Sequence, residues 1–360
     1  MTDLTFVGVL AVLVGLLFRW GFAVLPQEAW QIMAAVPIER EGSRMWRGCN
    51  FTFYGFFLAG ASAASAALII ILACSIGVHP LAILLVMALM LGLCVPSTRI
   101  IARIVEKKRH TLTIGGASFV GLVVAPWALW AVDEISGGYR VPMAPGLAAL
   151  SIGYALGEGL GRLGCISFGC CYGRPLPQCS PRIRHIFRRF NFVFLGHTKK
   201  VAYEGCLEGA EVVPIQAVTA LIYAATGLIG TALFLRGYFS LAFAFTIIAT
   251  LLWRALSELL RADYRGEGRI SAYQVLAVVG ILYSLIVTLL LPSESVPSPD
   301  LWTGLLSLWD PVIILSLQTL WLCVFLFTGK STVTECLMTF RVIGSESASK
   351  ASRDCSAGEA

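Results

Sequence analysis

Residues 161–175, GRLGCISFGCCYGRP, concentrate side chains that can do chemistry. They set Cys165, Cys170 and Cys171 between Arg162 and a second arginine, in a chain of which only 13% of residues are charged. Arginine suits phosphate because its planar guanidinium donates two parallel hydrogen bonds and keeps its charge when desolvated. A thiolate beside such cations is expected to have a lowered pKa and to act as a nucleophile. The segment therefore predicts a site for a phosphate-bearing ligand with thiols beside it.

Two apolar stretches each carry an arginine and a glutamate at helical spacing. Glu158 lies four residues before Arg162, and Arg254 lies four residues before Glu258, with Arg261 following on the same predicted helix face. A charge near the bilayer centre costs about 2.5–3.5 kcal/mol on insertion scales, so a retained one indicates function. The alternative is that these side chains extend to the membrane interface and form ordinary ion pairs between helices. A phospholipid between the two helices is the simplest ligand.

The composition predicts an all-α, polytopic membrane protein. Hydrophobic residues make up 57% of the 360 residues and the mean hydropathy is +0.80, which is more apolar surface than one globular core could bury. Runs of about 20 apolar residues predict about nine transmembrane helices, of which the central seven form a core. They lie at 4–25, 51–75, 80–102, 113–133, 143–164, 213–236, 239–261, 270–291 and 309–328.

These spans divide the chain into four predicted parts. Residues 1–50 form an anchor span and a basic loop, and residues 51–291 form the seven-span core with a polar insert at 166–212 between its fourth and fifth helices. An insert of this length in a compact bundle is usually functional. Residues 292–328 add one more span, and residues 329–360 have too few large apolar side chains for a core, which predicts disorder.

Several classes of function are disfavoured. The sequence lacks the motifs G-x-x-x-x-G-K-[ST], H-E-x-x-H and G-x-S-x-G, and its net charge of +6 is spread over loops with few interleaved aromatics, which argues against nucleic acid and for anionic lipid headgroups. No cofactor is expected. The other cysteines lack metal-ligand spacing, and the cluster at 165–171 is interpreted either as compact packing, with one disulfide an option, or as nucleophilic; no metal is predicted. Gly153, Gly157 and Gly161 share one helix face, which predicts close helix packing.

Taken in order, the motifs resemble those of the prolipoprotein diacylglyceryl transferase family. GRLGCISFGCCYGRP is similar to that family's signature, approximately G-R-x-G-N-F-x-N-G-E-x-x-G-R. The resemblance covers about residues 51–290. Its other elements are FTFYGFFLAG at 51–60, TIGGASFVG at 113–121, PIQ at 214–216, WRALSELLRADYRG at 253–266 and ISAYQ at 270–274.

The resemblance implies a transferase in the inner membrane of a bacterial cell. Family members move a diacylglyceryl group from phosphatidylglycerol to the thiol of a lipobox cysteine and release glycerol phosphate. By resemblance, Arg162 binds the headgroup of phosphatidylglycerol or another anionic phospholipid, Arg254 binds or gates it, and Tyr54 lines the pocket. The candidate site residues are Tyr54, Arg162, Cys170, Arg254 and Glu258 for catalysis, and Gly115, Gly116, Arg162, Gln216, Arg254 and Arg261 for substrate binding.

The chain departs from the family at positions that matter for catalysis. The family's histidine falls on Ile114, its asparagine on Cys165, and its two glutamates on Cys170 and Thr219. A thiol that attacks a glyceryl carbon needs a base to form the thiolate and a cation to stabilise the departing phosphate. The chain keeps arginines where the resemblance expects cations, but it has no base at the positions of the family's histidine and two glutamates.

Three readings follow from these departures. In the first, family chemistry survives, with Glu158, Glu258 or His110 as the base. In the second, a thiolate from Cys165, Cys170 or Cys171 serves another lipid-linked transfer. In the third, the protein binds or transports phospholipid without turning it over.

Orientation in the membrane is indicated by two features that disagree. Basic residues crowd alternate connections, including the long insert, so the positive-inside rule places the insert in the cytoplasm. The family resemblance places it outside. Because long loops count less in that rule, the interpretation follows the resemblance.

Overall fold

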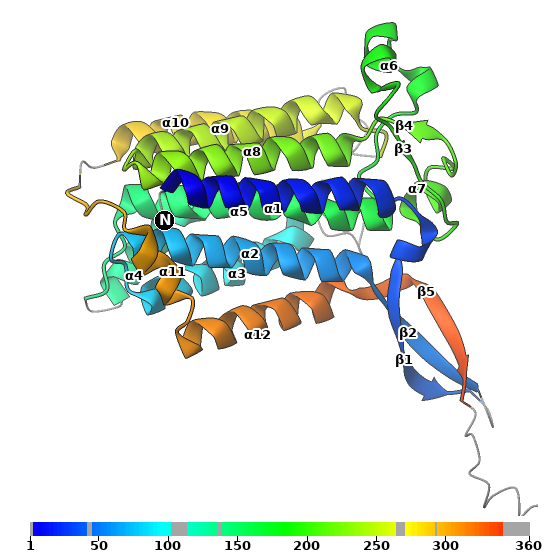
Figure 1. Cartoon of the computed structure of the whole chain (residues 1–360), viewed down its shortest axis with the longest axis horizontal. Helices are drawn as coiled ribbons and strands as arrows, with labels where there is room; N and C mark the ends of the chain where they lie inside the picture. Colours follow the sequence, from blue (N-terminus) through cyan, green and yellow to red (C-terminus); the bar gives the residue numbers. More distant parts are fainter. Residues whose placement is uncertain are drawn as a thin grey trace, which may run out of the picture.

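The computed structural model describes residues 3–41, 45–101, 114–135, 138–263, 271–291 and 294–340. Nine long helices within these ranges match the predicted spans to within a few residues (Figure 1). They are α1 (Asp3–Val24), α2 (Phe53–Ser75), α3 (Pro80–Ile101), α4 (Ile114–Ile135), α5 (Met143–Phe168), α8 (Ile215–Leu235), α9 (Phe239–Ser257), α10 (Ala272–Leu290) and α12 (Pro311–Thr328).

Eight of these helices are long and apolar enough to cross a membrane, which makes this a polytopic membrane protein. The exception among the described long helices is α5, whose sequence is less apolar. Most of its residues are buried, because α2, α8 and α9 pack along it and α1 and α4 contact it as well. Neighbouring helices rather than lipid surround α5, so it can carry charged and small residues at its surface.

Glycines let α5 approach its neighbours closely. A Cβ atom at Gly157 would lie 2.8 Å from the Cβ of Ser65 on α2, and the hydroxyl of Ser65 donates to the carbonyl of Gly153 at 2.7 Å. On the other side, a Cβ at Gly159 would lie 3.1 Å from the carbonyl oxygen of Ala220 on α8. The predicted packing role of the glycine stripe is therefore confirmed for Gly153 and Gly157.

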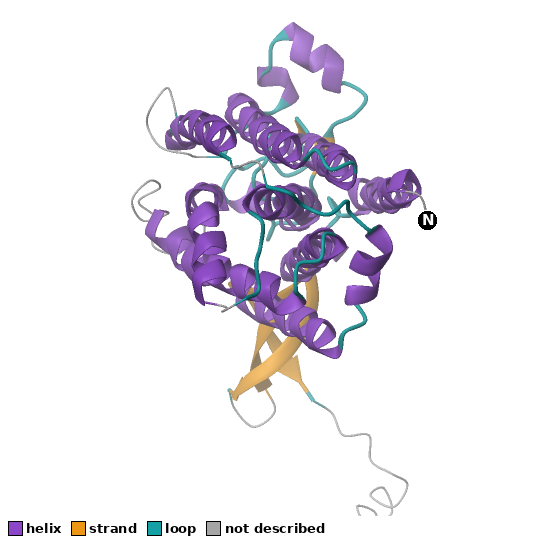
Figure 2. Cartoon of the chain, turned by 90° about the vertical axis from the view of Figure 1, so that its left-hand side faces the viewer, coloured by secondary structure: helices purple, strands orange, loops and turns teal. Residues whose placement is uncertain are grey.

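A three-stranded sheet extends from one end of the bundle, at the lower right of Figure 1 and below the helices in Figure 2. Its strands are β1 (Ile32–Arg40), β2 (Met45–Thr52) and β5 (Lys330–Thr339), antiparallel in the order β1-β2-β5. The prediction of a disordered tail is thus wrong for residues 330–339, because β5 finds a partner strand far away in sequence. Residues 341–360 lie outside the described ranges.

The polar insert between α5 and α8 covers the same end of the bundle as the sheet (Figure 1). Lys199 anchors the insert to this end of the bundle, since its fully buried Nζ donates to the carbonyls of Leu25 at 3.2 Å and Ser167 at 2.6 Å. The Thr198 hydroxyl also donates to Oε1 of Gln31 at 2.6 Å. The elements of the insert are η3 (Leu176–Gln178), α6 (Pro181–Phe187), β3 (Phe192–Val193), α7 (Lys200–Tyr203) and β4 (Glu211–Val212).

Candidate functional site

An apolar cavity of about 430 Å³ lies beside α5, between α2, α3, α4, α9 and α12. Its volume falls within the range of about 300–1,000 Å³ that is usual for small-molecule sites. Most of its lining is aliphatic or aromatic, and its polar groups include Tyr54, Tyr154 and Glu158. The cavity therefore offers an apolar space with a carboxylate in its wall, which suits an amphiphile.

Glu158 and Arg162 form an ion pair one turn apart on α5, as their spacing predicted. Both side chains are about nine-tenths buried. The Nε of Arg162 is also buried and has no hydrogen-bond partner among the described residues. Buried donors are nearly always satisfied in folded proteins, so this group points to an acceptor supplied by a ligand.

Arg254, in the last turn of α9, is a second buried guanidinium. It lies over the ring of Tyr273 and interacts electrostatically with Tyr154 and Tyr223. Among the residues that the structure describes, no carboxylate forms an ion pair with it. The two predicted arginine–glutamate pairs therefore differ: the pair on α5 forms, and Arg254 is left as a cation available to an anionic ligand.

The predicted single face of Arg254, Glu258 and Arg261 is broken by a change in backbone conformation. The α-helix ends at Ser257, a 3₁₀ turn, η4 (Glu258–Leu260), follows, and Arg261 is extended. Arg261 instead pairs with Asp263, Nε to Oδ1 at 2.8 Å and Nη2 to Oδ2 at 3.0 Å. Glu258 and Arg162 each interact electrostatically with Arg261, so all of them belong to one charged region at the insert end of the bundle.

The end of α5 brings the cysteines together. Gly169 is left-handed, with φ 71° and ψ 26°, its N–H donates to the carbonyl of Ile166 at 3.2 Å, and the N–H of Cys170 donates to the carbonyl of Cys165 at 3.1 Å. These two bonds form a Schellman motif, in which the side chains at the positions of Cys165 and Cys170 usually meet. Cys171 is also left-handed, with φ 55°, an unusual conformation for a residue with a Cβ atom.

The sulfur atoms of Cys165, Cys170 and Cys171 all lie within 4.8 Å of one another. The ten cysteines in the described ranges are thiols, so the optional disulfide does not form there. Hydrogen bonds with the other two thiols, together with burial, raise the pKa of Cys170 well above its ordinary value. The prediction of a lowered thiol pKa is therefore wrong for Cys170, because neighbouring thiols outweigh the arginines.

Residues of the insert and of α8 support the cysteine loop from outside. Lys200 pairs with Glu204 at 3.1 Å and interacts electrostatically with Cys170 and Cys171. Gln216 donates from Nε2 to the carbonyl of Cys170 at 2.9 Å, and its buried Oε1 has no hydrogen-bond partner among the described residues. The predicted residue Gln216 thus lies directly against the loop.

Three positions picked out by the resemblance lie outside both the cavity lining and the cysteine cluster. Thr219 has no carboxylate to offer. Its hydroxyl donates to the carbonyl of Ile215 at 2.7 Å and accepts from Trp253 at 3.0 Å.

The two predicted glycines lie at the start of α4. Gly115 is in its first turn, and Gly116 packs on Ile101 of α3, where a Cβ would lie 2.5 Å from the nearest side-chain atom. The cavity wall on α4 is formed instead by the residues that follow, Ala117, Ser118, Gly121, Leu122 and Ala125. His110 lies outside the described ranges.

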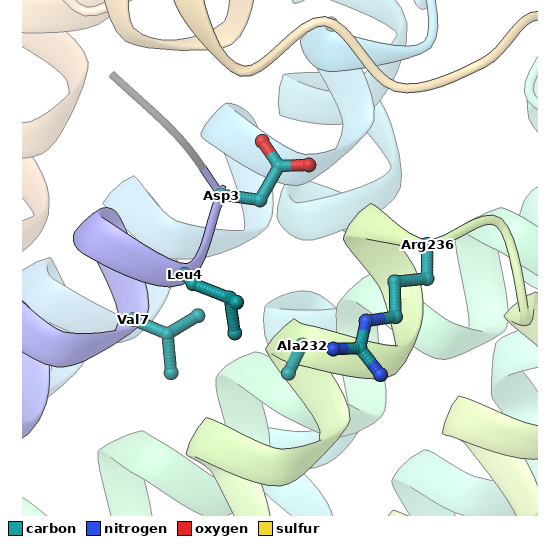
Figure 3. A pocket seen from close by; sticks show the side chains of 5 residues that line it. All are labelled: Asp3, Leu4, Val7, Ala232 and Arg236. Atoms are coloured by element: carbon teal, nitrogen blue, oxygen red, sulfur yellow. The ribbon is translucent and has the colours of Figure 1, made fainter.

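A second, smaller cavity of about 240 Å³ lies at the opposite end of the bundle (Figure 3). It is formed where α1 begins and α8 ends, and Arg236 extends along its wall. It is lined by five residues, Asp3, Leu4, Val7, Ala232 and Arg236. None of them comes from α5 or the cysteine loop, so this cavity is not part of the site.

The fold and this site define a class: a polytopic helical membrane protein with buried charges between an apolar cavity and a thiol cluster. Comparison with protein-family models, with curated proteins and with solved structures finds no match. The likeness to diacylglyceryl transferases therefore rests on the sequence motifs.

Proposed function

We propose that this protein is a membrane transferase that moves a diacylglyceryl group from phosphatidylglycerol to a cysteine thiol of a preprolipoprotein in a bacterial inner membrane. One observation carries the proposal: cavity, ion pair and thiol cluster follow one another along α5. Glu158 in the cavity wall precedes Cys165 by seven residues, about 10 Å at 1.5 Å per residue, with Arg162 between them. An anionic phospholipid has the same order of groups, with acyl chains at one end and a phosphate at the other.

The proposed roles follow from charge and burial. The acyl chains occupy the apolar cavity, and the phosphate accepts hydrogen bonds from Arg162, whose Nε lacks another partner among the described residues. Arg254, which has no carboxylate partner there, adds a second positive charge. Desolvated cations of this kind stabilise the negative charge that develops on a departing phosphate.

The reaction needs a base, and the base proposed here is Glu158, a carboxylate in the cavity wall. The acceptor thiol gives its proton to the carboxylate, and its sulfur forms a bond to the terminal glyceryl carbon. The bond between that carbon and the phosphate oxygen breaks, the electron pair stays with the phosphate, and glycerol phosphate leaves. The proton passes on to the leaving group or to water.

A transfer assay tests this proposal. Full-length protein in detergent is mixed with phosphatidylglycerol labelled in its diacylglyceryl part and with a peptide that contains a lipobox cysteine. Label should move to the peptide. Arg162→Lys keeps the charge beside Glu158 but loses the planar fork, so transfer should fall about 10- to 100-fold, the equivalent of about 1.5–3 kcal/mol. Arg182→Lys, the same change at an exposed position on α6, is the control and should leave transfer unchanged.

A second candidate is a phospholipid-binding protein that performs no transfer. Thr219 favours it, because its hydroxyl is fully engaged where the family has a glutamate. In the same assay this candidate gives phosphatidylglycerol that co-purifies with the protein and no label on the peptide. Such a result would refute the transferase proposal.

A further inference from the structure

Cys165, Cys170 and Cys171 form a group whose geometry fits a metal ion. Their sulfur atoms lie within 4.8 Å of one another. In a tetrahedral zinc site with bonds of about 2.3 Å, two sulfurs are about 3.8 Å apart, so closing this group on an ion needs shifts of about 1 Å or less. Thiolates are the ligands that zinc and other soft ions prefer.

The backbone holds the three thiols in this arrangement. The Schellman motif at Gly169 places Cys165 and Cys170 side by side, and the left-handed conformation of Cys171 turns its side chain to the same point. Outside the loop, the amide of Gln216 is bonded to the carbonyl of Cys170. A non-glycine residue kept at positive φ is typical of functional sites, because the surrounding structure must offset its strain.

The number of ligands and the nearby charges indicate which ion. No other cysteine, histidine, aspartate or glutamate of the described residues belongs to this group. Structural zinc sites have four protein ligands, whereas catalytic ones have three and an open position. The arginines nearby are already paired, Arg162 with Glu158 and Arg261 with Asp263. Before an acceptor binds, three thiolates therefore give the site a charge of −1 with a divalent ion and −2 with a monovalent ion. Excess buried charge is costly, so the site without an acceptor favours the divalent ion.

We propose that Cys165, Cys170 and Cys171 bind Zn²⁺ as thiolates and leave its fourth position open. A thiol that coordinates zinc is deprotonated, so zinc bound there would take over from Glu158 the task of forming the acceptor thiolate. This second step rests on the proposed function. It would explain how cysteines can stand where the resemblance places an asparagine and a glutamate. The acceptor proton would go to water and the acceptor sulfur would bond to the glyceryl carbon. The bond between that carbon and the phosphate oxygen would break with its electron pair on the oxygen, and glycerol phosphate would depart.

Metal analysis of the full-length protein tests the site without any activity measurement. Protein purified in detergent, stripped with a chelator and reloaded with Zn²⁺ should retain about one zinc per chain. Cys165→Ser and Cys170→Ser should each lose most of it. Cys171→Gly removes the thiol while suiting the positive φ, so its loss of zinc cannot be put down to misfolding. Cys323→Ser, at an exposed thiol on α12, should keep the zinc.

Cobalt substitution gives a second readout. Co²⁺ loaded in place of zinc should show thiolate charge-transfer absorption and the strong visible bands of four coordination. A lipobox peptide should shift these bands only if its cysteine is free. Absence of both zinc and cobalt binding in the reloaded protein, or binding of copper(I) alone, would overturn the proposal.

The transfer assay separates this proposal from the proposed function. If the protein binds zinc but shows no transfer activity, the proposed metal site is supported and the proposed transferase function is refuted. Transfer that continues undiminished in zinc-free protein and in Cys171→Gly refutes the role of the metal and leaves the transferase standing.

Discussion

The guanidinium carbon of Arg254 lies 5.5 Å from the ring centroid of Tyr273, so an arginine at the end of α9 is held over the first turn of α10. Such a contact contributes about 0.5–2 kcal/mol and fixes the direction of the charge. It holds the cation in place without neutralising it. A ligand phosphate would supply the missing countercharge.

Arg254→Gln should therefore separate ligand binding from folding. No described carboxylate is left unpaired by this change, so the melting temperature in detergent should fall only slightly. Binding of phosphatidylglycerol should weaken about tenfold or more, because a charge-assisted hydrogen bond is lost. Tyr273→Phe keeps the ring over which Arg254 lies and should retain lipid binding. Unchanged lipid binding in Arg254→Gln, measured with labelled lipid, would exclude a role for Arg254.

The Glu158–Arg162 pair should respond differently to the loss of one partner. Arg162→Ala leaves a buried carboxylate without its countercharge, which usually costs about 3–5 kcal/mol of stability. The double variant Glu158→Gln/Arg162→Gln removes both charges and should recover much of that loss in thermal unfolding, but not transfer. A double variant as unstable as the single one would show that the pair does not act as a unit.

Filling the cavity should block the lipid without touching the charges. Ala117 on α4 lines the cavity, so Ala117→Phe should reduce the amount of co-purified phospholipid several-fold. Leu241→Phe, which enlarges an exposed side chain on α9, is the control and should not. Equal lipid content in the two variants, determined by mass spectrometry, would place the acyl chains elsewhere.

Lys199 should make stability depend on pH. Burial lowers its pKa from 10.5 to about 8. Between pH 8 and 10.5 the unfolded chain binds the proton more tightly than the folded one, so stability should rise with pH across this window. At about 1.4 kcal/mol for each tenfold change in proton affinity, the rise amounts to about 3 kcal/mol. Lys199→Met should flatten the profile of melting temperature against pH, and an unchanged profile would contradict the assignment.

The orientation of the insert can be measured with a native thiol. Cys206 is exposed in the insert. If the insert faces outward, as the family resemblance implies, a membrane-impermeant maleimide should label Cys206 in intact cells, and Cys206→Ser should abolish this labelling. Labelling only after the cells are opened would place the insert in the cytoplasm, as the basic loops indicate.

The helices were predictable and the details of the site were not. Length and apolarity located the long helices, because a span must satisfy its own backbone across a fixed thickness. The predicted end of α5 at residue 164 was four residues early, since the insert covers the helix end and lets it continue to Phe168. Those four residues matter: they place Cys165 inside the helix, where the Schellman motif brings it to Cys170.

Contacts within one helix could be predicted from the sequence, whereas contacts that depend on distant parts of the chain could not. The pairing of Glu158 with Arg162 is local and could be read from spacing. The pairing of Arg261 with Asp263, and the lack of a described carboxylate partner for Arg254, depend on where the α-helix gives way to a 3₁₀ turn. The burial of Lys199 could not be predicted from the sequence, because it depends on contacts at the ends of α1 and α5.

The sheet has a consequence for how the protein is made. Thr52 at the end of β2 donates both its backbone N–H and its hydroxyl to the carbonyl of Gly329, 277 residues later, and β5 then pairs along β2. During synthesis the β1–β2 hairpin can form early, but its second edge stays unpaired until α12 has been inserted. An unpaired edge attracts other strands. Closure by β5 therefore takes place only once α12 is in position, and a chain that lacks α12 and β5 still exposes this edge of β2.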